Sequence, residues 1–358
     1  MRQDHSITVG THTLSLSAYI PQGSSKCVLY LHTHSGMALE GTDVARPLVS
    51  AGIGCVLFDF RGNGLSTGEY VSFGWHETFD LHAVVGYLRE KMGIKEIVLW
   101  GRSMGAATAI FYASTVFRQK HGGKLPLAPD CIRGMVLDSP FTDLTENIKR
   151  FVDSKASSVP GFVVDLALKY IEDDVRRRIG VSLAEISPCL YYDGLRYPTF
   201  IFASDKDELV SLQEIETLFR HIKNPIKKLR VVRGTHSEER PHHLTAQGVS
   251  FVSLLFGPTT TSTLPTRSPL QERSIQVLTN TPSTTLTQGP VISARSHLAP
   301  QPVQIRTRSP SQGSKSARPP SNVIVKKINQ PALPPAAPKR KKTFMEVDVE
   351  SDEEFRKL

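Results

Sequence analysis

The sequence predicts an α/β fold in which a mostly parallel sheet is covered by helices on both faces. Short apolar runs rich in β-branched residues alternate along the chain with longer segments of helical period, a pattern typical of such sheets. Several of the short runs end in polar or glycine-rich residues, and functional sites collect at these strand ends in open α/β sheets. Both observations favour one large domain with a site at the sheet edge.

The expected elements follow in chain order. Two antiparallel strands come first, at residues 6–9 and 13–20. Further strands are predicted at 27–32, 54–60, 96–100, 133–137, 198–203 and 229–232, and helices at 42–51, 75–92, 104–120, 212–222 and 243–256. These elements make an eight-stranded sheet.

A long insertion interrupts the alternation at residues 141–196. It separates two expected strands by far more residues than one crossover helix needs. Its segments 144–152 and 162–171 both carry apolar residues at helical spacing. We therefore predict an inserted helical cap.

The composition changes near residue 257. Residues 258–358 are rich in Ser, Thr and Pro, have only two aromatic residues, both Phe, and carry 15 Lys and Arg against seven Asp and Glu. Such a segment buries too little apolar surface to offset the entropy of ordering. We predict a folded domain at 1–257 and a disordered tail at 258–358. Because the positive charge lies mainly in the tail, the folded domain is not expected to bind nucleic acid.

Two basic clusters in the tail resemble a bipartite nuclear-import signal. The clusters are Lys326 and Lys327, then Lys339, Arg340, Lys341 and Lys342. A nuclear-import receptor is therefore an expected partner. The alternative interpretation is a solvated basic tail without a receptor.

The cysteines give no sign of a metal site. Cys27, Cys55, Cys131 and Cys189 are scattered and show no CxxC spacing, so we expect reduced thiols in a cytoplasmic or nuclear protein, with a disulfide pair as the alternative. Neither a secretion signal nor an apolar stretch long enough to span a membrane is recognisable. The glycine patterns of nucleotide-binding loops are missing as well, so no cofactor is expected.

The strongest functional signal is the segment Gly-Arg-Ser-Met-Gly at residues 101–105. It follows the apolar strand at 96–100 and opens a helix rich in alanine, which is the setting of a nucleophile elbow. A serine on this tight turn stands above the sheet edge, and the flanking glycines allow close backbone approach. We therefore predict that Ser103 is a nucleophile.

A serine hydroxyl needs a histidine to accept its proton and a carboxylate to orient that histidine. In the chain order that accompanies this elbow, the acid follows the serine and the histidine comes last. His236 lies just beyond the strand at 229–232 and is the predicted base. Candidates for the acid are Asp205 and Asp207, in the acidic segment 204–210, and Asp138 at the end of a neighbouring strand.

With these motifs the chain resembles α/β-hydrolases of the serine-aminopeptidase, monoglyceride-lipase and acyl-protein-thioesterase-like branch, across roughly residues 10–256. Residues 59–66 (Asp-Phe-Arg-Gly-Asn-Gly-Leu-Ser) look like the loop after the fourth strand of that branch, and 137–141 (Leu-Asp-Ser-Pro-Phe) like the entry to its cap. The pattern Gly-x-x-Asp-x-x-Val of the branch implies that Asp207 is the acid. Ser204 stands where relatives often have glycine, so a turn that needs a positive φ would have to differ here.

An oxyanion hole should combine two backbone N–H groups. One belongs to Met104, the residue after the nucleophile. The other is expected at His34, by its position in the loop after the third strand. Relatives usually have His-Gly in this loop, whereas Thr33 replaces the glycine here.

The resulting hypothesis is a serine hydrolase that cleaves an ester, thioester or amide bond through an acyl-enzyme, without a cofactor. Its substrate would be a small acyl-bearing molecule or a peptide. Phe162 and Leu166 on the apolar side of the cap favour an apolar acyl group, while the acidic run at 172–174 would suit the substrate amine of a serine aminopeptidase. A non-catalytic interaction module is the alternative from another class.

Truncation after Gly257 tests the predicted boundary. Because the predicted catalytic residues all precede it and the tail composition cannot build a core, residues 1–257 should stay soluble and keep full kcat. Limited proteolysis should trim the full chain to about residue 257 before it cuts the cap. Aggregation of the shortened chain, or a lower kcat, would contradict this division.

Overall fold

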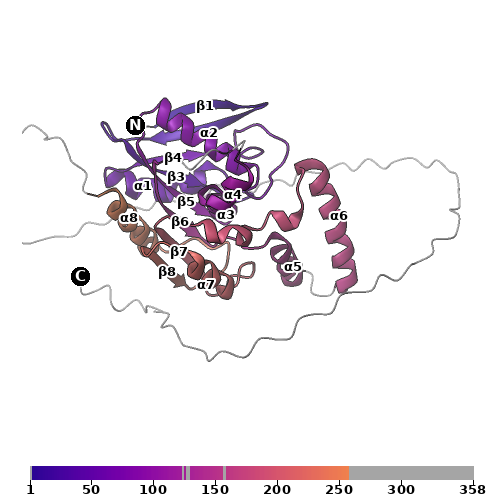
Figure 1. The fold of residues 1–358 in the computed structure, drawn as a ribbon. Coiled ribbons are helices and arrows are strands. Elements are labelled where there is room, and N and C mark those ends of the chain that lie inside the picture. Colours follow the sequence, from indigo (N-terminus) through magenta and orange to yellow (C-terminus); the bar gives the residue numbers. More distant parts are fainter. Residues whose placement is uncertain (1, 123–124, 126–129, 156–158, 258–358) are drawn as a thin grey trace, which may run out of the picture. The chain divides into compact units, whose positions relative to one another are not determined.

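The structure is a computed structural model that describes residues 2–122, 125, 130–155 and 159–257. The predicted α/β fold with an eight-stranded sheet is confirmed. The predicted tail, including the basic clusters at 326–327 and 339–342, lies outside the described residues. Figure 1 shows the sheet with helices on both sides.

The sheet has the spatial order β1-β2-β4-β3-β5-β6-β7-β8. β1 pairs with β2 and β2 with β4 in antiparallel fashion, and every other pair is parallel. The strands are β1 (Gln3–Val9), β2 (His12–Tyr19), β3 (Lys26–Leu31), β4 (Gly54–Phe58), β5 (Glu96–Arg102), β6 (Ile132–Asp138), β7 (Thr199–Ser204) and β8 (Lys227–Val232). The parallel strands therefore direct their carboxyl ends to one edge.

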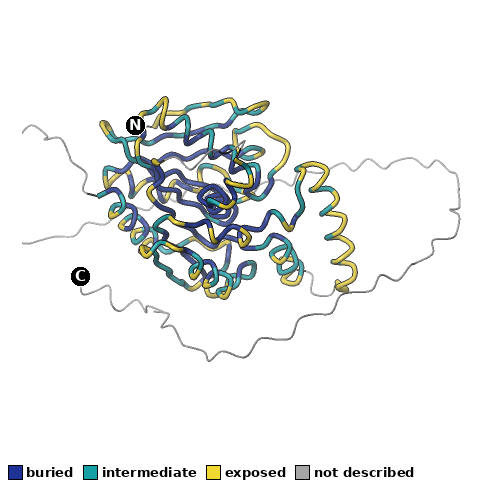
Figure 2. The backbone as a smooth tube through the Cα atoms, viewed as in Figure 1, coloured by how far each residue is buried: buried dark blue, intermediate teal, exposed yellow. Residues whose placement is uncertain are grey.

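Two helical layers cover the sheet. One contains α1 (Thr42–Ser50) and α8 (His242–Phe256). The other contains α2 (Glu77–Glu90), α3 (Met104–Ala113), α4 (Thr115–Lys120) and α7 (Leu212–His221). Side chains of β5 alternate between the layers as a strand requires: Ile97 and Leu99 join the second layer, and Val98 and Trp100 the first. Figure 2 shows the deepest burial in the sheet and in α3.

The predicted helical cap lies between β6 and β7. It contains α5 (Leu144–Lys155) and α6 (Gly161–Ile179), followed by the short 3₁₀ helices η2 (Leu183–Glu185) and η3 (Pro188–Gly194). A further 3₁₀ helix, η1 (Ala38–Gly41), precedes α1. α6 has no buried residue and lies at the far end of the cap from the sheet (Figures 1 and 2).

The helix predicted at 104–120 is divided in the structure. Ser114 separates α3 from α4 with an extended backbone, and its Oγ accepts a hydrogen bond from the N–H of Phe117 at 3.3 Å. The same hydroxyl donates to the carbonyl of Tyr191 at 2.7 Å. A serine that caps a new helix and bonds a distant carbonyl competes with continued helical bonding, which explains the break.

The four cysteines are free thiols, three of them buried, as expected from their scattered positions. Within the described ranges, no helix combines the length and the apolar character that crossing a bilayer would require.

The packing of α8 on the sheet depends on a glycine. A Cβ atom added to Gly248 would lie 2.3 Å from Cη2 of Trp100, which is buried in the core. We expect Gly248→Ala to lower the free energy of unfolding by about 1–3 kcal/mol, measured by urea denaturation. Gly86→Ala is the matched control in α2, where nothing lies within 4 Å, and it should raise stability by about 0.5–1 kcal/mol. Equal effects of the two changes would contradict this account.

Candidate active site

Ser103 occupies a strained turn between β5 and α3. Its φ of 50° and ψ of −113° are unusual for a residue with a side chain. A Cβ on Gly101 would lie 2.4 Å from backbone atoms of Gly105, and a Cβ on Gly105 would lie 2.0 Å from the carbonyl oxygen of Leu31. The Ser103 N–H donates to the carbonyl of Asp138 at 2.8 Å. The two glycines thus permit the tight backbone crossing that raises Ser103 above the sheet.

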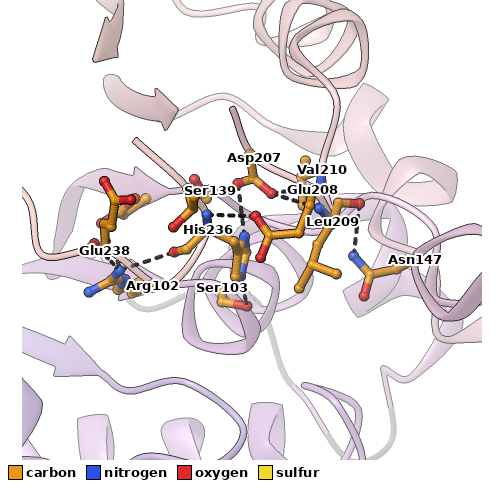
Figure 3. A network of polar contacts seen from close by, with 12 residues as sticks. Arg102, Ser103, Ser139, Asn147, Asp207, Glu208, Leu209, Val210, His236 and Glu238 are labelled. Atoms are coloured by element: carbon orange, nitrogen blue, oxygen red, sulfur yellow. Dashed lines mark hydrogen bonds and ion pairs between the residues drawn. The ribbon is translucent and has the colours of Figure 1, made fainter. Parts of the chain in front are cut away.

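A hydrogen-bonded chain connects Ser103, His236 and Asp207 (Figure 3). The distance from Ser103 Oγ to His236 Nε2 is 3.0 Å, and from His236 Nδ1 to Asp207 Oδ2 it is 2.8 Å. A carboxylate only accepts hydrogen bonds, so Nδ1 carries the imidazole proton and Nε2 accepts from the serine. Such a chain can withdraw the proton of the hydroxyl as it attacks a carbonyl.

Asp207 is held in its ionised form. Burial alone would raise the pKa of this carboxyl, but the hydrogen bond and charge of His236 and the N–H groups of Val210 and Leu209 outweigh it, so the pKa is lowered. Both N–H groups donate to Asp207 Oδ1 at 2.9 Å. The second oxygen is therefore left for the imidazole.

The two other candidate acids bond elsewhere. Asp205 Oδ1 accepts the N–H of Gly234 at 3.0 Å, and Asp138 forms an ion pair with Arg240 at 2.9 Å. Of the three acids, the structure brings Asp207 to the imidazole.

Relatives often have glycine at the position of Ser204, which suggested a positive φ there. Ser204 does not adopt one. It ends β7 in regular pairing with Val232, and the described non-glycine residues with positive φ are Phe73, Ser103 and Ser139.

The expected oxyanion donors lie on two segments that touch. Met104 is the first residue of α3, where helical N–H groups lack partners within the helix. His34 lies inside a turn closed by the hydrogen bond from Gly36 N–H to the Thr33 carbonyl, 3.2 Å. The close approach of Gly105 to the carbonyl of Leu31 shows that the strand leading to this turn packs against the segment of Ser103.

Three side chains that the motifs did not reveal hold the His34 turn. Glu40 accepts from the Thr33 N–H at 2.9 Å and from its hydroxyl at 2.7 Å. Asn63 Nδ2 donates to the carbonyls of His34 at 3.0 Å and Gly36 at 3.2 Å. His32 donates from Nδ1 to the Thr33 carbonyl at 2.6 Å and accepts the Phe60 N–H at Nε2 at 2.9 Å. Thr33 stands where relatives usually have glycine, and these hydrogen bonds with Glu40 and His32 hold it in place.

The His34 imidazole lies near His236. Burial lowers its pKa, and the neighbouring charge of His236 lowers it further. Its ring stacks on Phe73 with centroids 5.5 Å apart, and Phe73 meets Phe141 edge to face at 6.3 Å. The His34 ring is therefore part of a group of aromatic side chains with Phe73 and Phe141.

The cap residues expected to contact substrate are exposed. Phe162 is 74% exposed and Leu166 is 68% exposed, both on α6. The acidic run at 172–174 is engaged by arginines of the same helix: Glu172 pairs with Arg176 at 2.8 Å, and Asp174 pairs with Arg178 at 2.7 Å. These ion pairs offset the negative charge that would bind the amine of an aminopeptidase substrate.

No cluster of three or more His, Cys, Asp or Glu side chains suited to a metal ion occurs in the described part of the chain.

Known proteins show the same architecture. A family described as having the alpha/beta hydrolase fold matches residues 26–169. The esterase Pf2001 of Pyrococcus furiosus superposes with a TM-score of 0.56 at 25% identity, over 72% of this chain and 94% of the esterase.

Curated relatives also match by sequence. The uncharacterized protein YqkD of Bacillus subtilis is 23% identical over 61% of this chain and 67% of its own length. A lysophosphatidylserine lipase, ABHD12 of Danio rerio, is 32% identical over 39% of this chain, and the match spans only 35% of the lipase. The sheet order, the turn at Ser103 and these likenesses agree: the chain has the α/β-hydrolase fold.

Proposed function

We propose that this protein is a serine hydrolase that cleaves an ester, thioester or amide bond through an acyl-enzyme. The observation that supports it most is the hydrogen-bonded chain from Asp207 through His236 to Ser103. The three groups come from three different loops, and their order follows that of a nucleophile, a base and an orienting acid.

In the first step, Ser103 Oγ attacks the substrate carbonyl while His236 Nε2 accepts its proton. The ionised Asp207 holds the Nδ1 proton and stabilises the imidazolium that forms. His236 then gives the proton to the leaving group, and an acyl-Ser103 ester remains. Water, deprotonated by the same imidazole, hydrolyses this ester and restores the free serine.

The tetrahedral intermediate carries a negative charge on the former carbonyl oxygen. We assign the N–H groups of Met104 and His34 to this oxyanion. The unpaired N–H groups at the start of α3 also place the positive end of the helix dipole there. The anchoring of the His34 turn by Glu40 and Asn63 supports this role, because an oxyanion donor must be positioned before the charge develops.

An ester of an apolar acyl group is the substrate class that we favour. The aromatic side chain of Phe73 stacks on His34 and contacts Phe141, and the relatives include an esterase and a lysophosphatidylserine lipase. The engagement of Glu172 and Asp174 by arginines does not favour an aminopeptidase. A panel of short- and long-chain esters against amino-acid amides tests this preference.

A fluorophosphonate probe tests the proposed function. The probe should form a covalent bond with the wild-type protein at Ser103, identified by peptide mass spectrometry. Ser103→Ala should fold normally and remain unlabelled, because the labelled oxygen is gone and the side chain contributes little packing. An unlabelled wild type, or labelling that persists in Ser103→Ala, would favour the non-catalytic interaction module or another nucleophile.

The identity of the acid is tested by a pair of isosteric changes. Asp207→Asn should lower kcat by about 10⁴, because an amide at this position favours the wrong imidazole tautomer. Asp205→Asn should change kcat less than about tenfold, since Asp205 bonds only a backbone N–H of the same region. The reverse order of effects on ester hydrolysis would transfer the acid role to Asp205.

A further inference from the structure

Two arginines outside the Ser103–His236–Asp207 chain converge on the loop that carries His236. Arg240 Nη1 donates to the carbonyls of Thr235 at 3.2 Å and Glu238 at 3.1 Å. Arg102 Nη2 donates to the carbonyls of His236 at 3.1 Å and Glu238 at 2.6 Å, as Figure 3 shows. Guanidinium donors therefore hold the loop backbone before, at and after the imidazole.

One carboxylate lies next to both arginines and is hydrogen-bonded to Arg240. Arg240 Nε donates to Asp138 Oδ1 at 2.9 Å and to Oδ2 at 3.1 Å, and Arg102 Nε lies 3.7 Å from the same group. The Arg240 side chain is 7% exposed and that of Asp138 is 5% exposed. Burial of such charges is costly unless each is paired and hydrogen-bonded, and here both conditions hold.

The group of residues Asp138, Arg102 and Arg240 also contacts the segment that carries Ser103. Asp138 pairs in register with Arg102, the residue before Ser103, and its carbonyl accepts the Ser103 N–H. Arg240 Nη2 donates to the hydroxyl of Ser139 at 3.1 Å, a residue whose φ of 45° is strained. The same group of residues thus contacts both the segment of Ser103 and the loop of His236.

We propose that Asp138, Arg102 and Arg240 form a clamp that sets the position of the His236 imidazole relative to Ser103. The inference rests on the proposed function and makes Arg240 and Asp138 positioning residues. The segment between β8 and α8 has no regular structure to hold the imidazole, whereas proton transfer demands a placement better than about 1 Å. The clamp supplies that rigidity and gives Asp138 a role other than triad acid.

The test measures how fast a fluorophosphonate probe labels Ser103 in the full chain. Saturation kinetics separate the concentration for half-maximal rate from the maximal rate itself. Arg240→Met should lower the maximal rate about 10–100-fold, because the imidazole is displaced, and leave the half-saturating concentration unchanged. Arg133→Met is the matched control: its ion pair with Glu96 lies near the start of β6, far along the strand from Asp138, and its rate should stay within about twofold of wild type.

A double variant separates positioning from stability. Arg240→Met alone leaves Asp138 with less compensation, so the protein should also unfold at lower urea concentration. Adding Asp138→Asn removes that buried charge and should restore part of the stability, while the labelling rate stays low because the loop carbonyls still lack the Arg240 donors.

Recovery of the labelling rate together with stability would overturn the clamp as a positioning device. So would a wild-type labelling rate in Arg240→Met. A wild type that is not labelled at all would instead overturn the proposed function, and the clamp with it.

Discussion

The parallel register of β5, β6, β7 and β8 is the constraint on which the rest of the site depends. Arg102 pairs with Asp138, Asp138 with Phe202, and Ser204 with Val232, so four strands end at nearly the same level. The turn with Ser103 and the loops with Asp207 and His236 all leave the sheet from this line. Because their starting points are fixed by backbone hydrogen bonds, short loops suffice to bring the three side chains within hydrogen-bond distance.

Three aspartates at this edge show how surroundings assign different roles to the same side chain. Asp207 faces an imidazole and two N–H groups, so it stays ionised beside His236. Asp205 accepts a backbone N–H and shapes the turn that precedes His236. Asp138 pairs with the buried side chain of Arg240. The division follows from the donors that each carboxylate can reach, since most buried polar groups are hydrogen-bonded.

Backbone strain concentrates around the same edge. Phe73, Ser103 and Ser139 are the described non-glycine residues with positive φ. Each is fixed by other contacts: Phe73 by the His34 ring, Ser103 by the Asp138 carbonyl and Ser139 by Arg240. Strained residues persist where the surroundings determine them, and such places often coincide with functional sites.

The sequence by itself determined the fold class, the order of the strands along the chain, the cap and the position of the turn at Ser103. These features depend on local hydrophobic periodicity and on a motif whose glycines are needed for the tight turn at Ser103. Ser114 shows the limit of this local information, because its bond to Tyr191 divides a helix that periodicity alone joins. Three aspartates follow strands in the sequence, so periodicity alone does not identify the acid. The prediction of Asp207 depends on the resemblance to the hydrolase branch.

Only the tertiary structure decided which acid meets the imidazole and which residues hold the histidine loop. Arg240 and Asp138 are 102 residues apart, and Arg102 and Glu238 are 136 apart. Glu40, Asn63 and His32, which fix the His34 turn, likewise act on backbone groups. Backbone carbonyls and N–H groups are the same in every residue, so a side chain that binds them leaves no pattern in the sequence.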